Sequence, residues 1–186
     1  MSEMQVGDIK AKVKEKVEQD NASLLCLVVQ IVVETTRGHV DYSGYPTIMH
    51  PFGVAEACKH LGARIQALAL IHDTLEDHKN ESIWVTFVLD DTPITFPLEI
   101  TFEDLSRVLP ADVMEGLDHI TRRDNETYEE YIDRCVQCRM THMPKLEDNI
   151  GNDHRADDGL EPEEAERLRK RWRKARTTIR RAIRGS

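Results

Sequence analysis

The sequence predicts an all-α domain with one inserted β-hairpin. Aromatic residues make up only 5% of the 186 residues and hydrophobic residues 40%, a composition that favours packed helices over a β-sandwich. Apolar residues recur at three- and four-residue spacing through most of the chain, as in amphipathic helices. The exception is the stretch 84–100, where β-branched and aromatic runs flank a polar turn. The length suits a single domain over residues 1–186.

Two helices are predicted first. Apolar residues at every fourth position from Ile9 to Val17, between charged residues, indicate an amphipathic helix. The stretch 23–36 is apolar nearly all round and predicts a helix central to the core. Asp20 or Asn21 can cap its start, because their side chains accept hydrogen bonds from free backbone amides.

A loop and two further helices lead to the first chemical motif. Pro51 suits the first position of a helix that reaches Leu61 and ends at Gly62. His50 therefore stands at a helix start. The next helix is expected over 64–72.

The stretch 84–100 predicts a hairpin with strands at 84–89 and 94–100 and a turn at 90–93. Pro97 makes the second strand an edge strand, because proline has no amide proton for a ladder bond. We expect this insertion to shape the mouth of a site or an interface.

Capping and proline signals predict the remaining helices. They begin at Thr101, which has the capping-box form, and at Pro110, and three more are expected over 126–140, 145–152 and 162–183. The last helix carries many cations around an apolar stripe. We interpret these cations as a solvated face in preference to the lining of a phosphate cleft or a polyanion site.

Composition excludes several classes of protein. A net charge of −9 argues against nucleic acid or an anionic membrane as a partner. The first residues lack an apolar signal region, and the longest apolar run, 24–33, is too short to span a bilayer, so a cytoplasmic location is expected. We expect the four cysteines to be reduced packing thiols: Cys26, Cys58, Cys135 and Cys138.

The stretch 69–77 carries the strongest chemical signal, because a buried apolar run ends abruptly in His72 and Asp73. Glu76 and Asp77 follow about one helical turn later, where carboxylates can act on a water beside an ion. The alternative is a solvated helix end with a chance His-Asp pair.

Two further candidate ligands match this pair by type. They are His50, which could instead cap its helix, and Asp148, which could be a surface charge. Two imidazoles and two carboxylates form a borderline-hard site that suits Mn²⁺ and could take Fe²⁺, Co²⁺ or Zn²⁺.

Three segments resemble the signature segments of HD-superfamily hydrolases of RelA/SpoT type. They are G-Y-P-T-I-M-H-P at 44–51, H-D-T-L-E-D at 72–77 and K-L-E-D-N-I-G-N at 145–152. The sequence is most similar to free-standing small alarmone hydrolases, including metazoan SpoT-like, phage and bacterial forms.

The resemblance implies an HD-domain helical bundle that removes the 3′-pyrophosphate of (p)ppGpp to give GDP or GTP. It assigns one Mn²⁺ to His50, His72, Asp73 and Asp148, and activation of water to Glu76 and Asp77. Residues expected to hold the nucleotide are Tyr42, Ser43, Lys145, Asn152, Arg122 and Arg123.

The sequence departs from the family near the expected base site. Asp41 and Tyr42 stand where an Arg-Lys pair is common, and Thr47 replaces a tyrosine. A (p)ppApp alarmone is therefore admissible as substrate. Alternatives are an HD phosphohydrolase for a nucleoside phosphate or NADPH, and a catalytically silent nucleotide-binding module. The expected partner is a nucleotide, with no membrane and no nucleic acid, and a homo-oligomer stays open.

Overall fold

Helix α2 (Asn21–Thr35) is the central element of the computed structural model, which describes residues 3–41 and 44–185. Five of its apolar side chains are at most 1% exposed: Leu24, Leu27, Val28, Ile31 and Val32. Asp20 caps the helix by accepting a hydrogen bond from the Ala22 amide at 3.0 Å, as predicted. Helix α1 (Glu3–Gln19) packs beside α2 and buries Val13 and Val17. Both expected N-terminal helices are confirmed.

Helices α3 (Met49–Cys58) and α4 (Ala63–Ile71) continue this core and are joined by the 3₁₀ turn η1 (Lys59–Leu61). Gly62 separates the turn from α4 with a φ of 98°, a value that glycine adopts without strain. Pro51 is the third residue of α3, so the helix begins two residues earlier than predicted. The short helix α5 (Thr74–Asp77) follows α4 after a break at His72 and Asp73.

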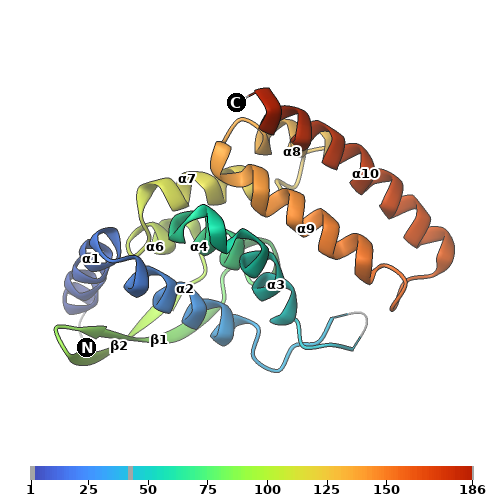
Figure 1. Cartoon of the computed structure of the whole chain (residues 1–186). Coiled ribbons are helices and arrows are strands. Elements are labelled where there is room, and N and C mark those ends of the chain that lie inside the picture. Colours follow the sequence, from blue (N-terminus) through green and yellow to red (C-terminus); the bar gives the residue numbers. More distant parts are fainter. Residues whose placement is uncertain (1–2, 42–43, 186) are drawn as a thin grey trace.

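The hairpin consists of β1 (Ser82–Leu89) and β2 (Thr92–Glu99), paired antiparallel. Its turn is shorter than the predicted 90–93, because Thr92 and Pro93 already pair with β1. Only Asp90 and Asp91 form the turn, with φ of 48° and 61°, the left-handed conformation of a type I′ hairpin. The inner face, with Val85, Phe87, Phe96 and Leu98, joins the main core beneath α1 and α2 (Figure 1).

The remaining helices are α6 (Phe102–Ser106), α7 (Ala111–Ile120), α8 (Tyr128–Cys135), α9 (His142–Arg155) and α10 (Pro162–Gly185), with a 3₁₀ turn η2 (Arg139–Thr141) before α9. Thr101 caps α6 by accepting from the Asp104 amide. The Asp104 carboxylate does not complete a capping box by binding the Thr101 amide. It binds Lys10 Nζ at 2.7 Å and the Glu99 amide at 2.8 Å instead.

Two of these boundaries differ from the prediction. Helix α8 starts at a capping box between Thr127 and Glu130 and ends at Cys135, so the expected helix 126–140 is too long. Helix α9 begins at His142 and extends to Arg155, beyond the expected 145–152. The chain after α8 turns sharply, since Thr141 Oγ1 donates to the Cys138 carbonyl at 2.7 Å.

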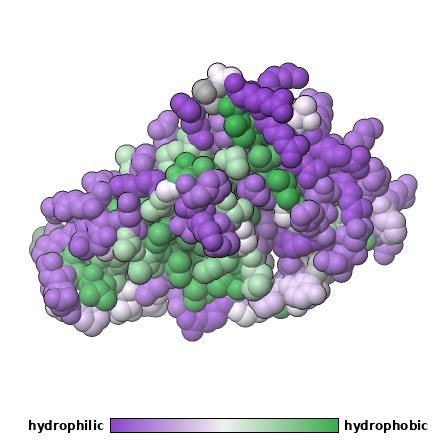
Figure 2. Space-filling view, in the orientation of Figure 1, coloured by the Kyte–Doolittle hydropathy of each residue, from purple (hydrophilic) through white to green (hydrophobic). Residues whose placement is uncertain are grey.

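Helices α8, α9 and α10 form a second layer beside the main core (Figure 1). Their shared apolar contacts include Tyr131, Leu146, Ala175 and Ile179. Figure 2 shows hydrophobic side chains gathered over the half that contains the hairpin and α2, whereas the half formed by α10 is mostly hydrophilic. Within the described ranges, no helix has both the length and the apolar character to cross a bilayer. The fold is thus mostly helical with one small sheet.

Candidate metal centre

His72 lies at the end of α4 and is 1% exposed. The Ala69 carbonyl lies 2.8 Å from His72 Nδ1, a contact in which Nδ1–H donates and which fixes the ring and leaves Nε2 as the free nitrogen. Nε2 is buried and makes no well-aligned hydrogen bond within the described part of the chain, although Asp73 Oδ2 lies 2.9 Å from it. A buried nitrogen without a partner is costly unless another group uses its lone pair.

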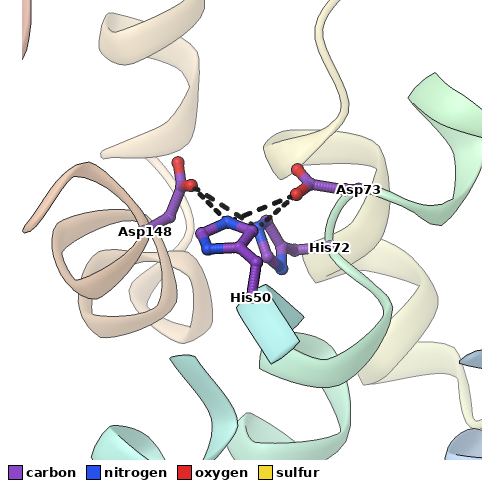
Figure 3. Close-up of side chains that lie close together, drawn as sticks. All are labelled: His50, His72, Asp73 and Asp148. Atoms are coloured by element: carbon purple, nitrogen blue, oxygen red, sulfur yellow. Dashed lines mark hydrogen bonds and ion pairs between the residues drawn. The ribbon is translucent and has the colours of Figure 1, made fainter. Parts of the chain in front are cut away.

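Three carboxylate and imidazole groups surround this nitrogen (Figure 3). Asp73 Oδ2 lies 2.9 Å and Asp148 Oδ1 3.6 Å from His72 Nε2. His50 Nε2 lies 3.0 Å from Asp148 Oδ1 and 3.5 Å from Asp73 Oδ2. One ligand atom from each of the four residues lies within 4.8 Å of the other three. The structure therefore brings the four predicted ligands together from α3, the α4–α5 break and α9.

The ionisable side chains of this cluster strongly shift one another's pKa values. Burial would lower the pKa of His72, but the carboxylates of Asp73 and Asp148 outweigh it and raise that pKa to about 10. Burial would raise the pKa of Asp148, but Lys145 and the two imidazoles hold it well below its usual range. The pKa of Asp73 is also lowered, against its burial, by His72. Without a metal ion, a proton on His72 supplies the positive charge that the carboxylates favour.

The donor set fits a divalent metal ion. Two imidazole nitrogens and two carboxylate oxygens are ligands of first-row transition metals, and the free Nε2 of His72 needs a partner of this kind. Gly151 adds room, because a Cβ at this position would lie 3.6 Å from His50 Nδ1 and a longer side chain would press on that ring. The group could hold a metal ion, whose identity the donors leave open.

Asp148 is held in place by two further residues that were predicted to bind substrate. Lys145 Nζ lies 2.6 Å from Asp148 Oδ2, and Asn152 Nδ2 donates to Oδ1 at 2.6 Å. Lys145 is 7% exposed and its Nζ also lies 4.8 Å from the centre of the Tyr131 ring. Lys145 and Asn152 thus orient a ligand of the cluster.

The cluster opens into a cleft of about 490 Å³. Glu76 and Asp77 line this cleft beside the four candidate ligands. Their side chains reach solvent, yet protein atoms surround much of each carboxylate, and this desolvation, together with the charge of Asp73, raises the pKa of both. The Arg122 amide donates to Glu76 Oε1 at 2.6 Å and fixes its orientation. These carboxylates are placed to exchange a proton inside the cleft.

The wall of the cleft opposite the cluster is cationic and aromatic. It includes Arg122, Tyr128, Arg171 and Trp172. The Arg171 guanidinium lies 4.4 Å from the centre of the Tyr128 ring. Partial burial lowers the pKa of Arg171, and repulsion from Arg122 adds to this effect, so both positive charges act on the same cleft. Such a pair favours an anion.

The sequence analysis missed several residues of this cleft as site residues. Tyr128 begins α8 and its hydroxyl donates to Asn149 Oδ1 at 2.8 Å. Arg155, in the last turn of α9, lies 3.1 Å from Asp41 Oδ2 across the cleft. A helical projection of 145–155 places Asn149, Asn152 and Arg155 at three-residue spacing on one side of the helix, a signal that could have identified this wall.

One predicted substrate contact, Arg123, stands apart from the cleft. The Arg123 guanidinium lies 3.2 Å from Asp118 Oδ2 and lines a neighbouring depression. Tyr42 and Ser43 lie outside the described residues. The hairpin contributes no residue to the wall of the cleft within the described ranges, so it does not shape the mouth of this site.

The four cysteines are free, as expected. Cys58 and Cys135 are buried, and burial raises the pKa of each thiol to about 12. Cys26 is exposed, so the prediction of a packing thiol is wrong for this residue.

The site is therefore a largely buried two-histidine, two-aspartate cluster in a cleft whose wall also carries a carboxylate pair and several cations. Comparison of the sequence with protein-family models and with curated proteins finds no match.

Proposed function

We propose that this chain is a metal-dependent phosphohydrolase of the HD superfamily that acts on a nucleotide. One observation carries the proposal: the four predicted ligands, which come from distant parts of the sequence, converge beside Glu76 and Asp77 in a single cleft. A metal-binding protein without catalytic activity has no need of the adjacent carboxylate pair.

The ion would be held by His50, His72, Asp73 and Asp148. A divalent ion bound there would lower the pKa of a water and offset negative charge on a phosphoryl oxygen. In the hydrolysis, the water oxygen forms a bond to phosphorus while the bond between phosphorus and the leaving oxygen breaks. One carboxylate of the Glu76–Asp77 pair would accept the proton that the water loses, and the pair would return one proton to the leaving oxygen.

The raised pKa of these two carboxylates supports this role. A carboxylate whose pKa is closer to neutrality is a better base and can also return the proton. The backbone amide of Arg122 binds Oε1 of Glu76 and so holds this carboxylate in one orientation at the wall of the cleft. The positive charge of Arg122 and Arg171 would hold substrate phosphates during the reaction.

The substrate we propose is an alarmone, with loss of the 3′-pyrophosphate of (p)ppGpp or (p)ppApp. The resemblance of the three signature segments supports this class, and the cationic aromatic wall suits a ligand with several phosphates and a base. A different nucleotide, such as NADPH or a nucleoside phosphate, is the second candidate. The observation that favours it is the carboxylate of Asp41 in the cleft, where the family often has arginine.

The test is release of phosphate or pyrophosphate from ppGpp, pppGpp, ppApp, dNTPs and NADPH, with Mn²⁺ and with chelator. We expect metal-dependent pyrophosphate from the alarmones. Asp73→Ala should abolish it, Glu76→Gln with Asp77→Asn should lower it by at least 100-fold, and Glu103→Gln, an exposed carboxylate far from the cleft, should leave it unchanged.

The other outcomes separate the alternatives. Turnover of NADPH or a dNTP alone would keep the hydrolase and overturn the alarmone assignment. Tight nucleotide binding without turnover in any metal would overturn the enzyme and favour a binding module. Activity that survives the double substitution would overturn the roles of Glu76 and Asp77.

A further inference from the structure

Helix α10 carries positive charge that is out of proportion to the rest of the chain. Between Pro162 and Gly185 it contains ten lysines and arginines and three glutamates, in a protein whose net charge is −9. The remainder of the molecule is thus strongly acidic and the cations are concentrated on one helix at the edge of the fold (Figure 1). The net charge of the whole chain conceals this separation of a basic helix from an acidic remainder.

Ion pairs account for the first half of the helix. Arg169 lies 3.3 Å from Asp153, Arg173 lies 2.8 Å from Glu166, and Arg176 lies 2.7 Å from Asp153. Arg167 and Lys174 also have carboxylate partners. The pairs with Asp153 tie α10 to α9, and the pair between Lys174 and Glu129 ties it to α8.

Five exposed cations of α10 have no ion pair among residues 3–41 and 44–185. One of them, Arg171, lines the cleft. The other four are Lys170, Arg180, Arg181 and Arg184, and we call them the free basic face. Lys170, Arg181 and Arg184 lie along one side of the helix, because 3.6 residues complete each turn, and Arg180 borders them. Trp172, Ala175 and Ile179 are buried on the other side. Charge therefore projects outward along most of α10.

This face lacks apolar surface. None of the large hydrophobic side chains that are exposed in the described residues belongs to α10, and Figure 2 shows the outer part of the helix as hydrophilic. A stable protein interface has an apolar centre, and an amphipathic membrane helix inserts its apolar side, which here is buried against α8 and α9. The remaining partner is a polyanion that binds through charge alone.

We propose that the free basic face of α10 binds the phosphodiester backbone of a nucleic acid without sequence specificity. Three of its four cations are arginines, whose guanidiniums pair with phosphate in a bidentate manner. From Lys170 to Arg184 the helix rises about 21 Å, a length that spans roughly six nucleotide steps of 3.4 Å. The acidic remainder of the molecule repels the backbone, so contact is confined to this helix. The prediction from net charge, which excluded nucleic acid, does not apply to this face.

The experiment is fluorescence polarisation with labelled 20-mers of single-stranded RNA, single-stranded DNA and duplex DNA at 50 and 200 mM NaCl. We expect Kd values in the range of about 10⁻⁴ to 10⁻⁶ M, with log Kd linear in log salt. The triple variant R180Q/R181Q/R184Q should weaken binding at least tenfold and lower the salt slope by about two for single strands. The control variant, Lys12→Gln with Lys59→Gln and Arg107→Gln, removes the same charge elsewhere and should bind like the wild type.

Three results of the binding assay would overturn the proposal. The first is the absence of binding by the wild type, and the second is equal weakening by the triple variant and its control. The third is equal binding of poly-glutamate, which would indicate a partner with an acidic protein surface. Sedimentation at the same concentrations tests a second copy of the chain: a dimer lost in the triple variant would also overturn it. Asp73→Ala should leave binding intact, because the cleft is not involved, and this separates the proposal from the hydrolase assignment.

Discussion

Replacement of Lys145 by Met should destabilise the protein by about 3 kcal/mol in chelator at pH 7. Lys145 Nζ lies 2.6 Å from Asp148 Oδ2, and the two side chains are 9% and 3% exposed. Loss of one partner of a buried pair typically costs about 3–5 kcal/mol, because the other charge stays buried without compensation. We expect the lower end, because His50 still contacts Asp148 Oδ1 at 3.0 Å. Methionine keeps most of the side-chain volume, so the cavity contribution is small.

The destabilisation caused by Lys145→Met should be smaller at acidic pH. The pKa of Asp148 is held well below its usual value, against its burial, by Lys145 and the imidazoles. Its carboxylate therefore contributes stability above the pKa of an unfolded aspartate, about 3.9, and that stability is lost as pH falls through the lower folded value. Without Lys145 the folded pKa is less depressed, so the variant has less stability to lose and the two proteins should converge as pH falls.

The assay is urea unfolding followed by tryptophan fluorescence, with thermal unfolding as a second measure. For a chain of this length, about 3 kcal/mol corresponds to a fall in Tm of roughly 6–12 °C. Lys12→Met, on the exposed side of α1, is the matched control and should change stability by less than about 0.5 kcal/mol. The double variant with Asp148→Asn should be more stable than the sum of the single effects. Equal stabilities for Lys145→Met and Lys12→Met would refute the reasoning.

Three other predictions concern packing, thiol chemistry and metal binding. Gly116→Ala should destabilise by about 1–3 kcal/mol in thermal unfolding, because its Cβ would lie 2.5 Å from the buried Leu68 Cδ2; a gain in stability, as helix propensity alone predicts, would contradict this contact. Cys58, whose pKa is raised to about 12 by burial, should resist a thiol reagent at pH 8 while exposed Cys26 reacts, and fast labelling of both would be inconsistent with the fold. Mn²⁺ must displace the proton of His72, because the carboxylates beside His72 raise its pKa to about 10 against the effect of burial. The Kd for Mn²⁺, measured by calorimetry, should therefore fall about tenfold per pH unit from pH 6 to 8. A Kd for Mn²⁺ that does not depend on pH would show that His72 is already neutral.

The sequence predicted the helical framework well, because its signals are local. The caps at Asp20 and Thr101 and the apolar spacing of α1 depend on residues within a few positions of each other. The end of α8 and the start of α9 were predicted less well. A hydrogen bond from Thr141 back to the Cys138 carbonyl fixes that bend, and apolar spacing alone cannot distinguish such a turn from a continuous helix.

The ligands of the cluster could be predicted, since histidine and aspartate at helix ends are recognisable by type and by the family resemblance. The opposite wall could not be predicted in the same way. Tyr128 and Arg171 come from separate helices, and their stacking at 4.4 Å depends on how α10 packs on α8. The free basic face needed the structure for another reason, because ion pairs between α10 and Asp153 decide which cations stay without a partner.

The most direct test of the central claim is the stoichiometry of Mn²⁺ binding, measured by electron paramagnetic resonance from the loss of the free-ion signal. Asp73→Ala is the informative variant, because the Asp73 side chain is 35% exposed and its loss should be tolerated by the fold. The account predicts one Mn²⁺ per wild-type chain and none in the variant, with circular dichroism unchanged. Equal binding by the two proteins, or no binding by the wild type, would contradict a metal centre at His50, His72, Asp73 and Asp148.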